Sequence, residues 1–223
     1  ARRVVFAVRD RNPAHNGRAV GILRRAGISV TENVCREEAM EILAPFFKRI
    51  VTGRPFVTLK LGMSVDGRIA DTTGRSRWIT SGAARRHTRG MRSLADAIVI
   101  GSGTALAADP ALLSDRSGRR PARVIVDSTG SLSTRAKVLA NRSVRAIIAV
   151  TKRCPAARAA AYAGAGAEVW RLPSRAGRVS LPALMRKLGA EGYLHVFCEG
   201  GGVLAESMVR GNLVDRFLFV IAP

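Results

Sequence analysis

Short runs of apolar, β-branched residues alternate with stretches of helical pattern along the whole chain. At the start, strand-like runs at Val4–Val8 and Ser29–Val34 flank a short helical pattern at Ala19–Ala26. A second helix is expected to begin at Arg36 and to be disturbed by Pro45, because proline removes a helix hydrogen bond and its ring crowds the preceding turn. The first quarter of the chain therefore predicts a small mixed unit of strands and helices.

A turn-forming stretch, Thr52–Pro55, joins this unit to the rest of the chain. Glycine and proline next to each other interrupt both helices and strands, so we place a domain boundary near Gly53. The prediction is two parts, residues 1–52 and residues 53–223.

Beyond this joint the alternation continues, and only one of the helical stretches carries a clear start signal. Ser81 can cap that helix, and Ala84, Thr88, Met91 and Ala95 would form its inward face. Strands that alternate with helices predict an α/β fold, with a sheet covered on both faces. The expected strands are Phe56–Leu61, Ala97–Ile100, Arg123–Val126, Ala146–Val150, Glu168–Trp170, His195–Phe197 and Phe217–Ile221.

Two of these strands run directly into glycine-rich turns that open helices, at Gly101–Thr104 and Glu199–Gly202. Glycine lets a ligand approach the backbone closely, and free N–H groups at a helix start favour phosphate. Two such loops at the carboxyl ends of strands would form one anion-binding crevice. Neither loop matches the dinucleotide pattern G-x-G-x-x-G, since Leu106 stands where a third glycine is required, and tight packing of helix on strand explains the glycines equally well.

Two further strand ends carry polar residues. Asp127 and Ser128 place a carboxylate and a hydroxyl at the same edge, either as site residues or as turn caps. The loop Thr151-Lys152-Arg153 offers cations for a further phosphate, such as the one that distinguishes NADPH from NADH, or is simply a solvated loop.

Acid/base and metal chemistry find little support in the sequence. His15, His87 and His195 occur in no Ser-His-Asp or Cys-His arrangement, and the zinc-deaminase signature H-x-E followed by P-C-x-x-C is absent. The cysteines Cys35, Cys154 and Cys198 stand far apart, which argues against a zinc ribbon or disulfide framework and favours buried thiols. What remains is a phosphate-rich ligand, with a nucleotide cofactor supplying the reactive group.

Charge is the strongest compositional feature: 37 basic residues against 16 acidic residues give +21 over 223 residues. A nucleic-acid-binding protein would need such a surplus, but a general enrichment in arginine also explains its scatter, and 5% aromatics give no stacking platform. No apolar run is long enough for a membrane-spanning helix and no apolar signal-peptide core is visible, so no membrane partner and a cytoplasmic location are expected.

One long stretch of the sequence resembles a known protein family. Residues 54–70, RPFVTLKLGMSVDGRIA, resemble the opening of the reductase domain of the bifunctional riboflavin-biosynthesis deaminase/reductase. Further matches to this family follow in order at Ser76-Arg77-Trp78-Ile79-Thr80, Arg92, Gly101–Thr104, Asp109-Pro110, Val126-Asp127-Ser128 and Glu199-Gly200-Gly201. The resemblance implies a dihydrofolate-reductase-like fold that binds NADPH and reduces 5-amino-6-(5-phosphoribosylamino)uracil, a phosphorylated pyrimidine, to its ribitylamino product.

The resemblance also implies site residues, by position. The cofactor contacts would be Gly62, Trp78, Thr104, Ser128, Gly201, Gly202, Val203, Leu204, Ala205, Glu206 and Ser207. The substrate contacts would be Ser76, Arg92, Leu112, Arg116 and Glu199, with the fork of Arg92 on the substrate phosphate. Two of these positions also have a purely structural explanation: Trp78 could be a core residue, and Arg92 could belong to a solvated helix face. Two departures matter: Ala108 stands where the family usually has an acidic residue, and Arg116 aligns only if one residue is inserted.

The resemblance extends to the first part of the chain. Asp10-Arg11-Asn12-Pro13 and Ala26-Gly27-Ile28 resemble the end of a cytidine-deaminase-like domain, whose zinc-binding segment would lie upstream of this sequence. The family also continues past Ile221-Ala222-Pro223, so we expect a fragment with a truncated reductase domain. The alternatives are another pterin or folate reductase on the same fold, and a basic nucleic-acid-binding protein without catalysis. The oligomeric state, including a homo-oligomer, stays open.

Overall fold

Seven parallel strands form the main sheet of the computed structural model, which describes residues 1–15, 17–74, 76, 79–114 and 120–222. The sheet is parallel at every strand pair, which confirms the predicted α/β class. Across the sheet the strands are β11 (Arg216–Ala222), β3 (Phe56–Ser64), β10 (His195–Cys198), β4 (Ala97–Gly101), β5 (Ala122–Val126), β6 (Ala146–Val150) and β7 (Glu168–Arg171).

Helices cover both faces of this sheet, as predicted. Successive side chains of a strand point to opposite faces, so Ala97 and Val99 belong to one buried cluster and Ile98 and Ile100 to the other. The first cluster packs against α7 (Leu181–Ala190) and α8 (Gly202–Arg210), and the second against α4 (Ser102–Ala108), α5 (Lys137–Ala140) and α6 (Ala156–Gly164).

Helix α3 (Gly82–Arg92) follows the sequence prediction closely. The Ser81 hydroxyl accepts a hydrogen bond from the Ala84 N–H at 3.2 Å, which confirms the predicted cap. Thr88 is buried on the inward face, and the helix delivers Arg92 to the sheet edge at its last residue.

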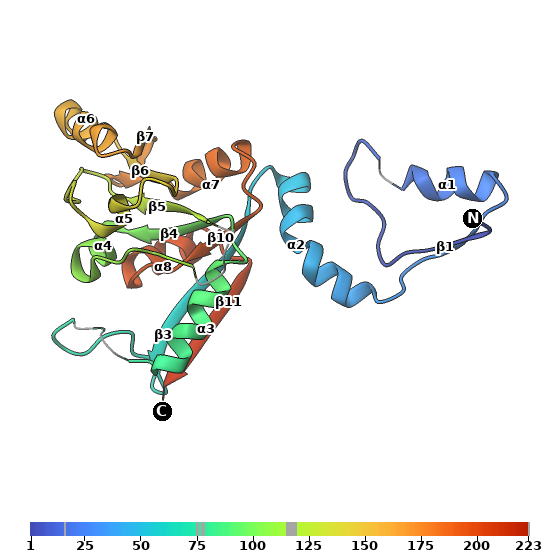
Figure 1. The fold of residues 1–223 in the computed structure, drawn as a ribbon, viewed down its shortest axis with the longest axis horizontal. Coiled ribbons are helices and arrows are strands. Elements are labelled where there is room, and N and C mark those ends of the chain that lie inside the picture. The colour runs from blue at the N-terminus through green and yellow to red at the C-terminus, as the bar shows by residue number, and fades with distance from the viewer. Residues whose placement is uncertain (16, 75, 77–78, 115–119, 223) are drawn as a thin grey trace.

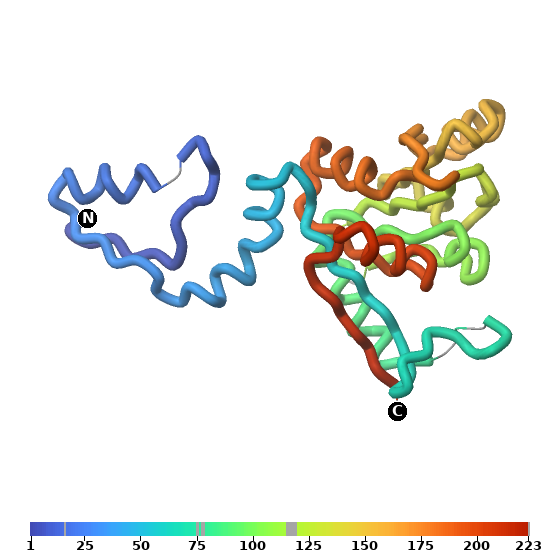
Figure 2. Tube along the Cα trace, turned by 180° about the vertical axis from the view of Figure 1, so that it is seen from behind, coloured from blue at the N-terminus to red at the C-terminus, as the bar shows by residue number. Residues whose placement is uncertain are grey.

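The first part of the chain forms a separate, smaller unit. Strands β1 (Arg3–Val5) and β2 (Ser29–Thr31) pair in parallel, and α1 (Arg18–Arg25) connects them. Figures 1 and 2 show this unit lying apart from the seven-stranded sheet, with α2 (Arg36–Thr52) leading from one to the other. Both strands are shorter than predicted.

Pro45 does not end the second helix: α2 runs through it for 17 residues. One missing N–H removes only one helix bond, and Phe47, two residues further on, is 5% exposed. The helix ends where the joint was predicted: Gly53 takes a left-handed conformation (φ 68°) and its N–H reaches Arg49 O at 2.7 Å. The division into residues 1–52 and 53–223 stays a prediction.

Three smaller features complete the fold. The hairpin of β8 (Ser174–Arg175) and β9 (Arg178–Val179) was not predicted. Cys154 and Cys198 are buried as expected, and burial raises the pKa of Cys198 to about 12, but Cys35 is exposed. Among the residues described here, no helix has the length and apolarity to cross a bilayer, and no three His, Cys, Asp or Glu side chains gather as metal ligands.

Candidate functional site at the carboxyl edge of the sheet

The two glycine-rich loops, which follow β4 and β10, meet at the carboxyl edge of the sheet. The Thr104 hydroxyl accepts a hydrogen bond from the Gly201 N–H at 2.9 Å and so joins the loops. A Cβ on Gly200 would lie 2.6 Å from the Leu204 side chain, so this glycine is required by packing. Tight packing therefore explains Gly200, while Gly201 lies at the junction of the two loops; the anion-binding crevice stays a prediction.

The first turn of α8 offers backbone donors at this junction. Within the described structure, the N–H groups of Gly202 and Val203 have no acceptor, as is usual for the first turn of a helix. Leu204 and Ala205 point into the core, with 8% and 6% exposure, so only their backbone can reach a ligand. Free N–H groups at a helix start suit a phosphate oxygen.

The last predicted cofactor contacts lie one turn further along α8. The Ser207 hydroxyl donates to Val203 O at 2.8 Å, and Glu206 pairs with Arg210 at 2.9 Å. Both side chains are thus engaged within their own helix.

Two predicted substrate contacts form a two-bond ion pair. Arg92 Nε lies 2.5 Å from Glu199 Oε1, and Arg92 Nη2 lies 3.0 Å from Glu199 Oε2. The side chains are only 15% and 12% exposed, so water screens the pair weakly. Helix α3 and the end of β10, 107 residues apart in sequence, supply the partners. The structure therefore brings Arg92 and Glu199 together, and the guanidinium fork is filled by the carboxylate.

A conformationally unusual segment supports this pair from the other side. The third arm of Arg92, Nη1, donates to Leu113 O at 2.9 Å. Leu112, a predicted substrate contact, is 5% exposed, and its φ of 51° is rare for a residue with a branched side chain. Its side chain belongs to the core, so a ligand could reach only its backbone. Asp109, three residues earlier, is also left-handed (φ 37°).

Lys60 is a further candidate at this edge that the sequence analysis did not name. It is half-buried in β3, and burial lowers the pKa of its ammonium group, with Arg92 lowering it further and Glu199 raising it. Gly62, a predicted cofactor contact, lies two residues on, where a Cβ would stand 3.5 Å from Lys60 Nζ and 3.3 Å from Thr80. In a strand, a lysine between apolar residues usually indicates a face exposed to solvent, so the sequence gives no reason to single out Lys60. Only the pairing of β3 with β10 brings its strand beside the strand that ends at Glu199.

Asp127 and Ser128, although neighbours in sequence, have different structural roles. Asp127 is fully buried and accepts bonds from Ser131 N, Ser131 Oγ, Leu132 N and Tyr162 OH, so it is a turn cap with no oxygen left for a ligand. The Ser128 hydroxyl is half-buried and accepts from the Val179 N–H at 3.0 Å. Ser128 therefore stays at the sheet edge as a polar group beside the β8–β9 hairpin.

Three predicted contacts lie in loops. Trp78 and Arg116 fall outside the described residues. Ser76 is exposed in the long connection between β3 and α3, whose first half, residues 65–74, extends away from the sheet in Figure 1.

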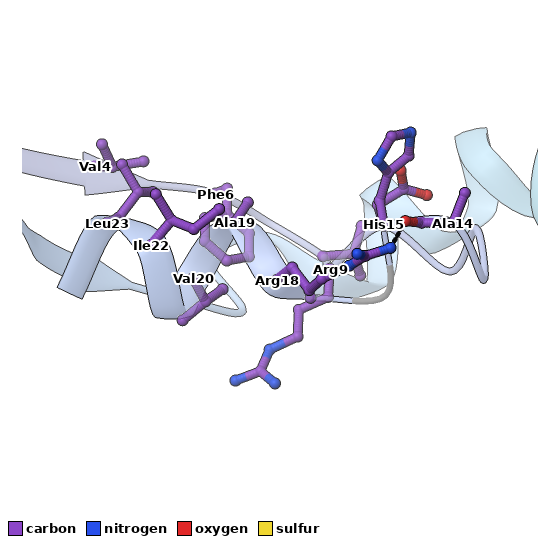
Figure 3. Close-up of a pocket in the computed structure, with 13 residues that line it drawn as sticks. Val4, Phe6, Arg9, Ala14, His15, Arg18, Ala19, Val20, Ile22 and Leu23 are labelled. Carbon is purple, nitrogen blue, oxygen red and sulfur yellow. Dashed lines mark hydrogen bonds between the residues drawn. The ribbon is translucent and has the colours of Figure 1, made fainter. Parts of the chain in front are cut away.

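Two hollows lie near other parts of the chain. One, of about 640 Å³, lies between β1 and α1 and is lined by apolar side chains such as Phe6 and Leu23 together with the polar side chains of Arg9, His15 and Arg18 (Figure 3). It contains none of the predicted site residues. The other, of about 470 Å³, lies between α8 and strands β3 and β11, where Gly202, Ala205 and Glu206 meet the rings of Phe217 and Phe219. The predicted α8 contacts are thus divided between this hollow and the loop junction.

Known proteins resemble this chain both in sequence, at 30–34% identity, and in fold. The riboflavin biosynthesis proteins RibD of Aquifex aeolicus and Escherichia coli are 34% and 33% identical over 100% and 99% of this chain, and over 61% and 62% of their own lengths. Two solved structures, each 30% identical, superpose well: Acinetobacter baumannii RibD, form 1 (TM-score 0.84; all of this chain, 61% of that chain), and a Thermotoga maritima protein described as a diaminohydroxyphosphoribosylaminopyrimidine deaminase/5-amino-6-(5-phosphoribosylamino)uracil reductase (TM-score 0.78; 94% and 57%).

A more distant structure, the Saccharomyces riboflavin biosynthesis reductase Rib7, shares the fold at 22% identity, with a TM-score of 0.59 over 82% of this chain and 81% of its own. The chain spans about three fifths of the length of the curated relatives. The sequence profile of the RibD C-terminal domain matches residues 55–223. With that match over most of the chain, the protein belongs to the RibD C-terminal domain family.

Proposed function

We propose that residues 53–223 carry an NADPH-dependent reductase that converts 5-amino-6-(5-phosphoribosylamino)uracil to 5-amino-6-(5-phosphoribitylamino)uracil. The observation that carries this proposal is the cluster of Lys60, Arg92 and Glu199 beside the two joined glycine-rich loops, in a chain of the RibD C-terminal domain family. Cations and a carboxylate suit a phosphorylated sugar, and the loops suit the phosphates of a dinucleotide.

The residues of the crevice fit NADPH. The free N–H groups of Gly202 and Val203 match its pyrophosphate, and the close approach at Gly201 leaves no side chain in the way. Thr104 and Ser128 add hydroxyls along the same edge. Bound there, NADPH supplies the hydride for the reduction.

The substrate would compete with Glu199 for Arg92. A phosphate offers the guanidinium fork the same two-oxygen partner as the carboxylate does. When the phosphate takes the fork, the Glu199 carboxylate is released to accept hydrogen bonds from a sugar hydroxyl or a pyrimidine N–H. The ion pair thus keeps both groups in position and partly desolvated until the substrate arrives.

Lys60 would hold the proton that the reaction needs. Opening of the sugar ring gives an imine, and addition of hydride to its carbon leaves a nitrogen that must gain a proton. The Lys60 ammonium group feels the charge of Glu199, and its lowered pKa makes it a better acid than a solvated lysine.

The test is the oxidation of NADPH by the purified protein, followed by absorbance, with 5-amino-6-(5-phosphoribosylamino)uracil as substrate. Loss of a charge-assisted contact costs about 1.5–3 kcal/mol, so Arg92→Ala should lower kcat/KM by about ten- to a hundredfold while leaving NADPH affinity nearly unchanged. Arg92→Lys keeps the charge without the fork and should recover part of the loss.

A matched variant examines the cofactor side. Gly201→Val should weaken NADPH binding, since the added side chain would meet Thr104, but should spare the substrate contacts. If Arg92→Ala reduces NADPH affinity as much as turnover, Arg92 belongs to the cofactor site or to the fold instead.

A further inference from the structure

We propose that Asp109 is a positioning residue for the substrate: its carboxylate fixes the segment Asp109–Leu113, and the Leu113 carbonyl holds the guanidinium group of Arg92 in place. This inference rests on the proposed function, because it concerns how Arg92 is presented to the substrate phosphate. The segment follows α4 and reaches the Arg92–Glu199 ion pair at Leu113.

Two residues of this segment have a backbone conformation that residues with side chains rarely adopt. Asp109 ends α4 with φ 37° and ψ 57°, and Leu112 has φ 51°. Aspartate tolerates left-handed backbone better than most residues, but Asp109 precedes Pro110, and the residue before a proline normally takes an extended conformation. Because such conformations persist only where their surroundings determine them, the contacts of this segment are what hold its shape.

The Asp109 carboxylate makes the first of these contacts. Its Oδ1 accepts a hydrogen bond from the N–H of Lys137, the first residue of α5, at 2.9 Å, and the two residues are 28 positions apart. Ala136, which precedes α5, has no side-chain oxygen that could accept this bond. The Lys137 ammonium group lies 3.8 Å from Oδ2, but its side chain is 68% exposed, so this ion pair contributes little. Asp109 therefore joins the end of α4 to the start of α5 through a backbone donor.

Leu112 makes the second contact. Its side chain is 5% exposed and belongs to the same buried cluster as Ala105, Leu132 and Val138. Fixed at Asp109 and at Leu112, the chain presents the Leu113 carbonyl to Arg92 Nη1 at 2.9 Å, while the Leu113 side chain is exposed. The position of this carbonyl is thus set by the two preceding anchors.

The Leu113 carbonyl matters most when the substrate binds. Arg92 uses Nε and Nη2 for Glu199, and these are the donors that the substrate phosphate would take. Leu113 O is then the one acceptor that the described residues still offer to Arg92. A guanidinium plane fixed by its third arm keeps the geometry that two phosphate oxygens require, and its side chain has less freedom left to lose on binding.

Substitutions at Asp109 separate its carboxylate from its backbone conformation. Asp109→Gly keeps the left-handed conformation and removes the acceptor, so the KM for the pyrimidine should rise about three- to tenfold, with little change in kcat or NADPH affinity. Asp109→Asn retains an acceptor oxygen and tolerates the same conformation, so its KM should stay close to that of the unaltered protein.

Lys137 offers a matched pair of variants from the other side of the same hydrogen bond. Lys137→Pro removes the donor N–H at the first position of a helix, where proline is accepted, and should raise KM as Asp109→Gly does. Lys137→Ala removes the side chain but keeps the N–H, and should change KM by less than about twofold. Partial unfolding would lower the amount of active protein, and so the apparent kcat, without raising KM.

A double-mutant cycle shows whether Asp109 acts through Arg92. In an Arg92→Ala background, Asp109→Gly should change KM by less than about twofold, since the group that it positions is gone. An equal rise of KM in both backgrounds would overturn the inference, and so would a KM that neither Asp109→Gly nor Lys137→Pro changes.

Binding of ribose 5-phosphate, measured by calorimetry without NADPH, separates this inference from the function on which it rests. Arg92→Ala, Asp109→Gly and Lys137→Pro should each weaken this binding, and Lys137→Ala should not. If these effects on binding occur and no pyrimidine is reduced, the positioning role stands and the proposed function fails. If the pyrimidine is reduced but Asp109→Gly alters neither KM nor this affinity, the positioning role is wrong and the function stands.

Discussion

Lys60 shows how one residue can carry more chemistry than its sequence context suggests. Its neighbours in β3 are apolar, and its half-buried ammonium group interacts with Glu199 and Arg92 from two other elements. Burial is the largest cause of its lowered pKa, and the Glu199 carboxylate opposes that effect. Burial therefore sets most of the pKa shift of this side chain, and the ion pair that we propose receives the substrate adjusts it.

This gives a prediction about pH. If Lys60 supplies the proton, kcat should fall as pH rises through its lowered pKa, at a lower pH than an ordinary lysine would titrate. Lys60→Met should lower kcat, remove this alkaline fall and leave NADPH binding unchanged. Glu199→Gln removes the one group that raises the pKa of Lys60, so the fall should move to lower pH whatever the residual rate. An alkaline limb that Lys60→Met leaves in place would assign the proton to another group.

At the scale of single residues, the sequence predicted which residues lie in the candidate site better than it predicted the partners of their side chains. Arg92 and Glu199 could be named from their motifs, but their mutual ion pair could not, since 107 residues separate them and only the adjacency of α3 and β10 brings them together. The same applies to Asp127, which stands beside Ser128 in the motif and yet is turned inward by bonds to Ser131, Leu132 and Tyr162.

At the scale of elements, the turn after β5 is held by buried polar bonds. The Tyr162 hydroxyl, from α6, lies 3.0 Å from Asp127 Oδ2 and 2.9 Å from Leu132 O, and the side chain has no exposed surface. Arg158, one turn earlier, donates to Gly130 O at 2.9 Å and to Leu132 O. Helix α6 thus clamps the loop that begins with Ser128, so its stability matters for the sheet edge as well as for the core.

Tyr162→Phe should accordingly lower the free energy of unfolding by about 1–2 kcal/mol at neutral pH, because a buried hydrogen-bonding group is lost. Burial, together with the nearby Asp127, raises the pKa of Tyr162 to about 12 in the folded protein, against an ordinary value of about 10 when unfolded. A raised folded pKa gives stability that is complete below pH 10 and is lost as pH rises through 12. The difference between the two proteins in urea unfolding should therefore shrink above pH 10. A difference that is constant from pH 7 to 11 would contradict this account.

Element boundaries were predictable where a local signal exists. The Ser81 cap, the end of α2 at Gly53 and strand β6 agree with the sequence because each depends on neighbouring residues only. Pro45 marks no boundary, because one lost helix bond leaves the other bonds of α2 in place. The β8–β9 hairpin has two residues per strand, too few to produce an alternating pattern, and it is held by partners from other loops.

At the scale of the whole molecule, the alternating pattern was enough to predict an α/β sheet with helices on both faces, but not the strand order. The order places β10 between β3 and β4, so the last glycine-rich loop lies beside the first. That arrangement creates the crevice, and it depends on contacts between residues about a hundred positions apart, which no window of local pattern contains.

The charge of the whole molecule, +21, gives the last prediction. Part of the positive charge serves the fold: Arg49 and Arg171 donate to backbone carbonyls, and Arg145 pairs with both Glu168 and Glu191. The rest is spread over helices and loops rather than gathered for one groove of a duplex. Binding to duplex DNA should therefore be weak, should fall linearly in a plot of log affinity against log salt, and should be lost at about 0.15 M salt. Fluorescence anisotropy with a labelled duplex across a salt series measures this. Submicromolar affinity that persists at about 0.15 M salt would instead favour a nucleic-acid partner, because general attraction alone is then too weak.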